Sequence, residues 1–200
     1  MKTTKKDPTD TLNDILFGSD DDDNDISERD LYLINEIDED IAKNLIADIV
    51  RINREDDKKE KKLRDFVRLP ITIFINSPGG CMYSTLGILD IISESKTPIH
   101  TKIIGVAASA AGIIFMAGHK RYMNMFGTLM YHNITSGIEG NKYQFKVEVK
   151  QITKAQKLID SLFLKNSILT KDILNEWRLA KVDKYIDYTM AKRLKMITEE

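Results

Sequence analysis

Two hundred residues, 42% of them hydrophobic and 30% charged, suit one domain with a continuous core. The formal net charge of -1 gives no general attraction to nucleic acid or to an anionic membrane surface, so we expect neither as a partner. A single cysteine, Cys81, excludes an intramolecular disulfide, and with three histidines it forms no zinc spacing. We therefore expect a cytoplasmic chain that holds no metal.

The chain begins with an acidic segment. Residues 1–28 hold nine acidic side chains and three lysines, without apolar periodicity, which predicts a disordered tail before a folded domain over 29–200. The first residues are polar and lack the apolar stretch of a secretory signal. The longest uncharged run, 103–118, is shorter than the ~20 apolar residues that a membrane span needs.

Strands and helices alternate through the rest of the chain, which predicts an α/β fold with a largely parallel sheet. The charged run 54–62 reads as a helix end or a loop. Apolar residues at 145, 149, 152, 155, 159 and 162 predict a long amphipathic helix with no obvious place in a compact core. The predicted strands are 31–34, 71–75, 99–104 and 128–132, and the predicted helices are 41–52, 82–93, one from about 108, about 143–165, 171–178 after Thr170, and 188–194 after Asp187.

Small residues surround one serine at a predicted junction of strand and helix. Ser109 lies within Gly105-Val106-Ala107-Ala108-Ser109-Ala110-Ala111-Gly112. This position places the hydroxyl at the positive end of a helix, where free backbone N–H groups stabilise an oxyanion. Upstream, Asn76-Ser77-Pro78-Gly79-Gly80 follows a buried strand, and its glycines leave further N–H groups uncovered.

Taken singly, these signals are weak, because Pro-Gly-Gly also suits any tight turn and an isolated Ser109, His132 or Asp183 is more often structural. The order and spacing of these residues in the chain decide between a structural and a catalytic role. The order Ser, His, Asp argues against the α/β-hydrolases, in which the acid precedes the histidine and the nucleophile lies in Gly-x-Ser-x-Gly.

The sequence resembles the proteolytic subunit of the Clp protease over roughly residues 29–200. Four stretches carry this resemblance: Ile75-Asn76-Ser77-Pro78-Gly79-Gly80, Gly105-Val106-Ala107-Ala108-Ser109, Met130-Tyr131-His132 and Val182-Asp183-Lys184-Tyr185-Ile186. The resemblance implies the Clp protease and crotonase type of α/β fold, a repeated ββα superhelix with a protruding handle helix.

It also implies a serine endopeptidase with Ser109 as nucleophile, His132 as general base and Asp183 as the residue that orients the base. The backbone N–H groups of Gly80 and Ala110 would form the oxyanion hole. No cofactor is needed for bond cleavage. In the family, two seven-membered rings joined by the handle helix enclose the sites, and an ATP-driven AAA+ unfoldase such as a Clp ATPase supplies unfolded protein. The sequence has no phosphate-binding Gly-x-x-x-x-Gly-Lys-Ser/Thr motif, so ATP hydrolysis requires a separate partner.

The sequence departs from the family pattern at several places. Ala110 replaces the methionine that usually follows the nucleophile, and Ile134 stands where the family usually has a proline, two positions after the histidine. The acidic segment 1–28 replaces the N-terminal segment usual in the family. Three alternatives therefore stay open: a crotonase relative acting on acyl-CoA, which the complete triad disfavours, a stand-alone phage head-maturation protease of the same fold, and an inactive ring partner.

Overall fold

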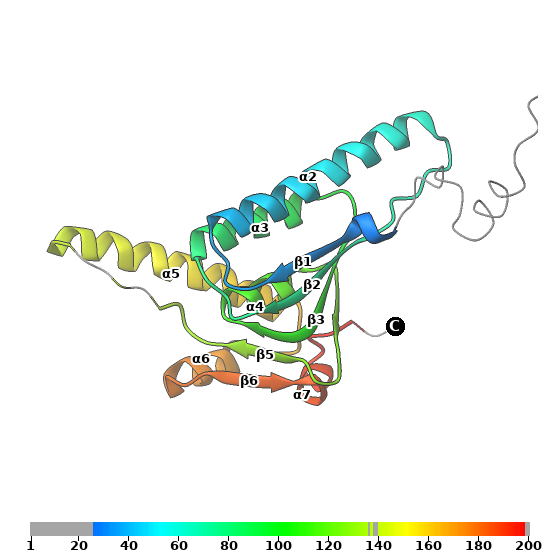
Figure 1. The fold of residues 1–200 in the computed structure, drawn as a ribbon. Helices are drawn as coiled ribbons and strands as arrows, with labels where there is room; N and C mark the ends of the chain where they lie inside the picture. The colour runs from blue at the N-terminus through cyan, green and yellow to red at the C-terminus, as the bar shows by residue number, and fades with distance from the viewer. Residues whose placement is uncertain (1–25, 136, 138–139, 199–200) are drawn as a thin grey trace, which may run out of the picture.

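The computed structural model describes residues 26–135, 137 and 140–198. Residues 1–25 of the predicted tail lie outside this range, and the last part of that segment belongs to a short 3-10 helix. The fold is the α/β arrangement expected from the sequence (Figure 1). In chain order its elements are η1 Ile26–Arg29, β1 Asp30–Ile34, α2 Glu39–Lys62, β2 Ile71–Ser77, α3 Met82–Glu94, β3 Ile99–Ala108, α4 Ala110–Ala117, β4 Lys120–Met123, β5 Thr128–Tyr131, α5 Lys142–Lys165, α6 Lys171–Ala180, β6 Lys184–Asp187 and α7 Tyr188–Arg193.

One sheet organises the described residues. Its strand order is β1-β2-β3-β5-β6, and β4 also pairs with β3. The beginning of β3 pairs with β4 and its end pairs with β5. The two short strands thus share the edge of β3 that does not pair with β2. All of these pairs are parallel except β5 with β6, which is antiparallel. Consecutive parallel strands joined through helices bring several strand ends to one side of the sheet.

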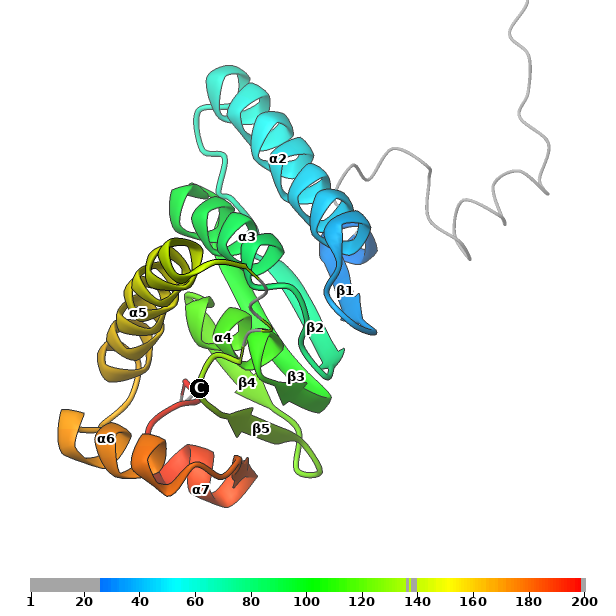
Figure 2. The same ribbon diagram turned by 90° about the vertical axis from the view of Figure 1, so that its left-hand side faces the viewer.

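Helices α2, α3, α4 and α5 cover one face of the sheet, as the two ribbon views show together (Figures 1 and 2). Alternate residues of β2 are fully buried beneath them, namely Ile71, Ile73 and Ile75. This period of two is what a strand with one covered face requires. Every residue of α4 from Ala110 to Met116 is buried, which makes this helix the centre of the core.

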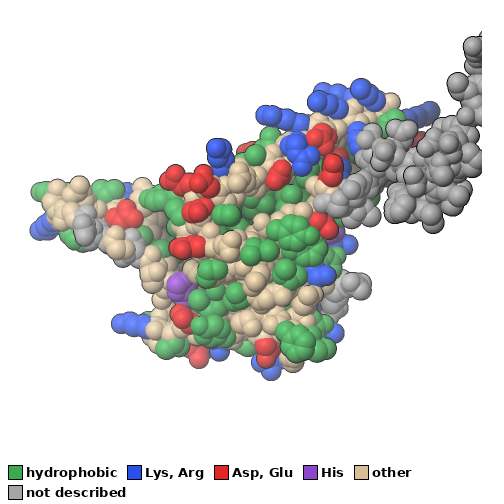
Figure 3. Space-filling view, in the orientation of Figure 1, with side chains coloured by type: hydrophobic (Ala, Val, Ile, Leu, Met, Phe, Trp, Pro, Cys, Tyr) green, Lys and Arg blue, Asp and Glu red, His purple; other side chains and the backbone are tan. Residues whose placement is uncertain are grey.

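The first helix after β1 begins at a cap and ends in a charged surface. The Asp38 carboxylate accepts the backbone N–H of Ile41, which stabilises the first turn. The charged run 54–62 continues α2 to Lys62 and is the helix end that the sequence allowed. Lys and Arg side chains follow this helix along the upper edge of the molecule (Figure 3). Within the same helix, Asp56 is buried and bonded to Arg29 from η1.

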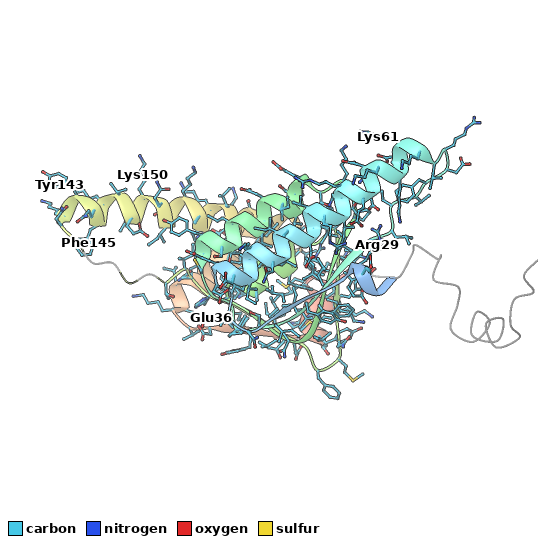
Figure 4. The ribbon with its side chains drawn as sticks, turned by 45° about the horizontal axis from the view of Figure 1, so that its top comes forward. Arg29, Glu36, Lys61, Tyr143, Phe145 and Lys150 are labelled. Carbon is cyan, nitrogen blue, oxygen red and sulfur yellow. The ribbon has the colours of Figure 1, made fainter. Side chains whose placement is uncertain are left out.

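The long amphipathic helix is α5, which begins after a capping box formed by Asn141 and Gln144. The expectation that it lacks a place in the core holds for its first half only. Ile159 and Phe163, in its second half, are buried in the core of this chain. Tyr143 and Phe145 lie on the end that projects from the body (Figure 4) and are exposed. The sequence alone does not show where the domain ends along a helix of one continuous pattern.

Two strands were not expected from the sequence. Both β4 and β6 are only four residues long and carry lysine, so their apolar signal is weak. The third predicted strand also ends later than expected, because the small residues before Ser109 continue β3 to Ala108. No helix in the described ranges is both long enough and apolar enough to cross a membrane.

Candidate active site

Ser109 is the single residue between the end of β3 and the start of α4. Its backbone has φ 53° and ψ -121°, a region that residues with a Cβ rarely adopt. Its N–H donates to the carbonyl of Met130 at 3.0 Å, and its own carbonyl accepts from Ile113 at 3.2 Å. The sharp turn is thus held between β5 and the first turn of α4. Small neighbours are required here: a Cβ on Gly112 would lie 2.8 Å from the side chain of Leu129.

His132 follows β5 directly and faces Ser109. Because β5 pairs with the end of β3, the two chain segments that carry these residues are adjacent. The His132 Nε2 atom lies 2.6 Å from the Ser109 Oγ atom, a hydrogen-bond distance. For Nε2 to accept the serine proton, the ring proton must be on Nδ1. The strand pairing therefore brings a nucleophile and a base together from positions 23 residues apart.

Asp183 lies between α6 and β6, beside the other ring nitrogen of His132. Helix α6 ends at Ala180, its C-cap residue Lys181 has the left-handed conformation, and β6 then pairs antiparallel with β5. This pairing places Lys184 opposite Tyr131, so the residues next to them, Asp183 and His132, are also close. The Asp183 Oδ1 atom is 3.8 Å from His132 Nδ1. This contact is electrostatic and too long for a direct hydrogen bond.

The predicted oxyanion donors lie on both sides of Ser109. Gly80 forms a bridge with Ile37, in which the flanking residues Gly79 and Cys81 make the hydrogen bonds. Successive N–H groups of an extended segment alternate in direction, so the N–H of Gly80 points away from Ile37. Ala110 is the first residue of α4, where an N–H has no acceptor within its own helix.

Gly79 brings these two backbone segments together. It has φ +100°, and a Cβ placed on it would lie 2.8 Å from Ser109 Cβ and 3.0 Å from the Ala110 nitrogen. Only glycine allows so close an approach. The structure thus brings together all five residues that the sequence singled out.

An apolar cavity of about 420 Å³ opens beside Ser109 and His132. Several of its lining residues come from α5, which the sequence reasoning placed outside the core and therefore missed as part of the site. These residues follow Ser109 by 39 residues or more in the chain, and no local sequence pattern indicates that they lie close to it. The lining residues are Gly80, Cys81, Met82, Tyr83, Leu86, Ser109, Ile113, Tyr131, His132, Ile134, Thr135, Glu148, Gln151, Ile152, Lys154, Ala155, Leu158, Ile159 and Phe163.

The sequence reasoning also missed Cys81 as a residue of this cavity. Its thiol is exposed, and hydrogen bonding to Ser84 at the start of α3 lowers the pKa of that thiol. The sequence indicated a place near the site only through the position of Cys81 directly after Gly80. In the described part of the chain, no three His, Cys, Asp or Glu side chains come close enough to hold a metal ion.

The arrangement has the parts that acyl transfer requires: a hydroxyl at hydrogen-bond distance from an imidazole, a nearby carboxylate, two candidate oxyanion donors and a largely apolar cavity. A family model described as Clp protease matches residues 20–197. This match includes every candidate site residue.

Proposed function

The chain belongs to the Clp protease family, and on that premise we propose that it is a serine endopeptidase whose triad is Ser109, His132 and Asp183. The observation that carries the proposal is the 2.6 Å contact between Ser109 Oγ and His132 Nε2, made by a serine in a strained backbone conformation. Strain of this kind costs of order 1–3 kcal/mol and persists where function selects it.

The proposed reaction proceeds through an acyl-enzyme. Ser109 attacks the carbonyl carbon of the scissile peptide bond while His132 takes the hydroxyl proton. The tetrahedral intermediate places its oxyanion against the N–H groups of Gly80 and Ala110. His132 then returns the proton to the leaving amine, and water hydrolyses the ester by the same steps. Asp183 favours the imidazole tautomer with its proton on Nδ1. No cofactor takes part in these steps.

The apolar cavity beside the nucleophile supports a peptide substrate. Ile113 and Phe163 lie in its walls, so an apolar side chain that precedes the scissile bond would be removed from water there. Short peptides or unfolded chains are the proposed substrates, because a folded domain does not present an extended backbone to a recessed serine.

We also propose that the chain assembles with itself through α5 into stacked rings, heptameric as in the family. Tyr143, Phe145, Val147 and Val149 are exposed on the first half of α5. Hydrophobic side chains on this projecting end are also visible in Figure 3. Burial against a second copy would remove this apolar surface from water. An AAA+ unfoldase such as a Clp ATPase is the proposed partner for folded substrates.

The experiment combines active-site labelling with measurement of mass. A fluorophosphonate probe should label Ser109 and abolish cleavage of an unstructured peptide, whereas the Ser109→Ala variant should neither label nor cleave. Size-exclusion chromatography with light scattering then measures the assembly. Labelling at another serine would refute the triad. An assembled but inactive wild type indicates a ring partner, and a monomer that cleaves folded protein unaided indicates a stand-alone protease.

A further inference from the structure

A cluster of polar side chains adjoins the segment that carries His132. It consists of Tyr131, Gln156, Asp160 and Arg178, and we call it the Asp160 cluster. Its members come from three elements: β5, α5 and α6. The triad chemistry described above uses none of these side chains.

The carboxylate of Asp160 is the centre of this cluster. Its Oδ1 atom accepts hydrogen bonds from the Tyr131 hydroxyl at 3.2 Å and from Gln156 Nε2 at 3.0 Å. Its Oδ2 atom accepts from the Arg178 guanidinium at 2.6 Å. Only 14% of the Asp160 side chain is exposed. A carboxylate so far removed from water is held in place by its partners, since any loss leaves a charge without compensation.

The same cluster fixes the backbone on both sides of His132. The Ile134 N–H donates to Gln156 Oε1 at 3.1 Å, on one side. On the other, Tyr131 immediately precedes His132 and is bonded to Asp160. The Asn133 amide nitrogen in turn donates to the carbonyl of Arg178 at 3.3 Å. Three sequence neighbours of His132, one before it and two after it, thus make side-chain or backbone hydrogen bonds to α5 or α6.

The cluster also reaches the segment that carries Asp183. Arg178 lies in the last turn of α6, five residues before Asp183, and its ion pair with Asp160 ties that turn to α5. The ring of Tyr131 packs 5.8 Å from that of Trp177, which itself lies under the Lys184 ammonium. Burial, together with the charge of Asp160, raises the pKa of Tyr131, so its hydroxyl keeps its proton and acts as a donor.

We infer that Asp160, acting through Tyr131 and Arg178, is the positioning residue that sets the distance between His132 and Asp183. This inference rests on the proposed function. The pairing of β5 with β6 brings His132 and Asp183 near each other, but no hydrogen bond closes the 3.8 Å between Nδ1 and Oδ1, so contacts from other elements must fix that distance. Since an active-site group displaced by about 1 Å can cost 10²-fold in rate, a contact that holds both segments governs turnover.

The test is the Asp160→Asn variant, which keeps the size of the side chain and removes its charge. We expect kcat per titrated active site to fall by roughly 10- to 100-fold, with KM changed less than about twofold, because the substrate cavity is retained. Sites are counted by the end point of fluorophosphonate labelling, so unfolded protein does not enter the rate. Tyr131→Phe, which removes one oxygen and keeps the ring packing, should lower kcat in the same way but less.

The matched control is Asp57→Asn. Asp57 is also an aspartate paired with an arginine, at 2.5 Å from Arg68, but it lies on α2 and does not line the cavity. It should leave kcat per site unchanged. The double variant Asp160→Asn with Arg178→Gln should lose no more than the more damaging single variant, because both changes break one contact.

A wild-type kcat per site in Asp160→Asn would overturn the inference, and so would an equal loss in Asp57→Asn. Either result leaves the proposed function intact so long as the wild type labels at Ser109 and cleaves peptide. If the wild type does neither, the proposed function fails first.

Discussion

Nδ1 of His132 and Oδ1 of Asp183 lie 3.8 Å apart, so the carboxylate acts on the imidazole through its charge rather than through a direct hydrogen bond. The side chain of Asp183 is half exposed, which means that folding depends little on it. Replacement of Asp183 should therefore affect catalysis more than the free energy of unfolding.

Asp183→Asn should lower kcat far more than it lowers the melting temperature. The neutral amide lacks the negative charge that favours the tautomer with its proton on Nδ1 and that stabilises the imidazolium, a change that costs ~10⁴ in a serine protease with a hydrogen-bonded triad. The measurement is peptide turnover per labelled Ser109, beside thermal unfolding of both proteins. A near-wild-type rate would leave Asp183 with a structural role only.

Ser109→Gly and Ser109→Ala should both be inactive, but the glycine variant should be the more stable of the two. At φ 53° a Cβ carries strain that glycine does not, of order 1–3 kcal/mol. Part of that gain is offset by the greater freedom of glycine in the unfolded chain, about 0.4–1 kcal/mol. Chemical denaturation measures the free energy of unfolding of the two inactive variants. A higher value for the alanine variant would show that the backbone at residue 109 is not strained.

Gly79→Ala should reduce peptide turnover by about 100-fold or more, because the new methyl group would push the Ser109 turn away from Gly80. Its Cβ would lie 2.7 Å from the carbonyl oxygen of Ala108, which is backbone and cannot rotate aside. Turnover of an unstructured peptide, per folded protein, measures the effect.

The control for this change is Gly87→Ala in α3. There the nearest atom to a new Cβ is Ile46 Cδ1 at 3.4 Å, an ordinary contact. Alanine should leave turnover unchanged and raise the stability of the helix by up to about 1 kcal/mol. Equal activity in the two variants would show that the close approach at Gly79 does not matter for catalysis.

Replacing Phe145 and Val149 by Asp should split the assembly into single rings or smaller species. Both side chains are exposed on the projecting half of α5, and burial of an unpaired carboxylate costs several kcal/mol. Light scattering after size-exclusion chromatography gives the mass. Ile159 is unsuitable for this purpose, because it is buried in the chain's own core and its replacement would test folding.

The control is Val67→Asp, which introduces the same charge at an exposed apolar residue outside α5. This variant should keep the wild-type mass. A wild type that is monomeric, or a double variant of unchanged mass, would be inconsistent with assembly through α5.

Asp56→Asn should destabilise the fold by about 3–5 kcal/mol at neutral pH, since it removes the charge of a fully buried carboxylate that pairs with the largely buried Arg29. Burial acts to raise the pKa of Asp56, but hydrogen bonds from Arg29 and Thr97 outweigh it, and the pKa is lowered. A lowered folded-state pKa gives stability that is fully present above the ordinary carboxyl pKa of about 3.9 and is lost as the pH falls below it.

The difference between wild type and Asp56→Asn should therefore shrink as the pH falls below about 4. Urea denaturation at a series of pH values measures it. A constant difference down to pH 3 would mean that the charge of Asp56 does not contribute.

The sequence by itself determined most of the helices and strands and selected the candidate catalytic residues, but it did not predict β4 or β6. The strongly apolar run 71–75 predicted β2, and the caps Thr170 and Asp187 correctly predicted the starts of α6 and α7. These signals are local, since the period of a strand and the hydrogen bonds of a cap involve only neighbours in the chain. The motifs around Ser109, His132 and Asp183 selected the candidate residues, through their order and their resemblance to one family.

Only the tertiary structure decided which surfaces meet. The apolar pattern of α5 is continuous, yet Ile159 enters the core while Phe145 projects beyond it. The same packing bonds Asp160 to Tyr131, next to His132, and lines the cavity beside Ser109 with residues of α5. Sequence periodicity shows that a helix has an apolar face, but the partner of that face depends on where distant strands end, and that is set by the pairing of β3 with β5 and of β5 with β6.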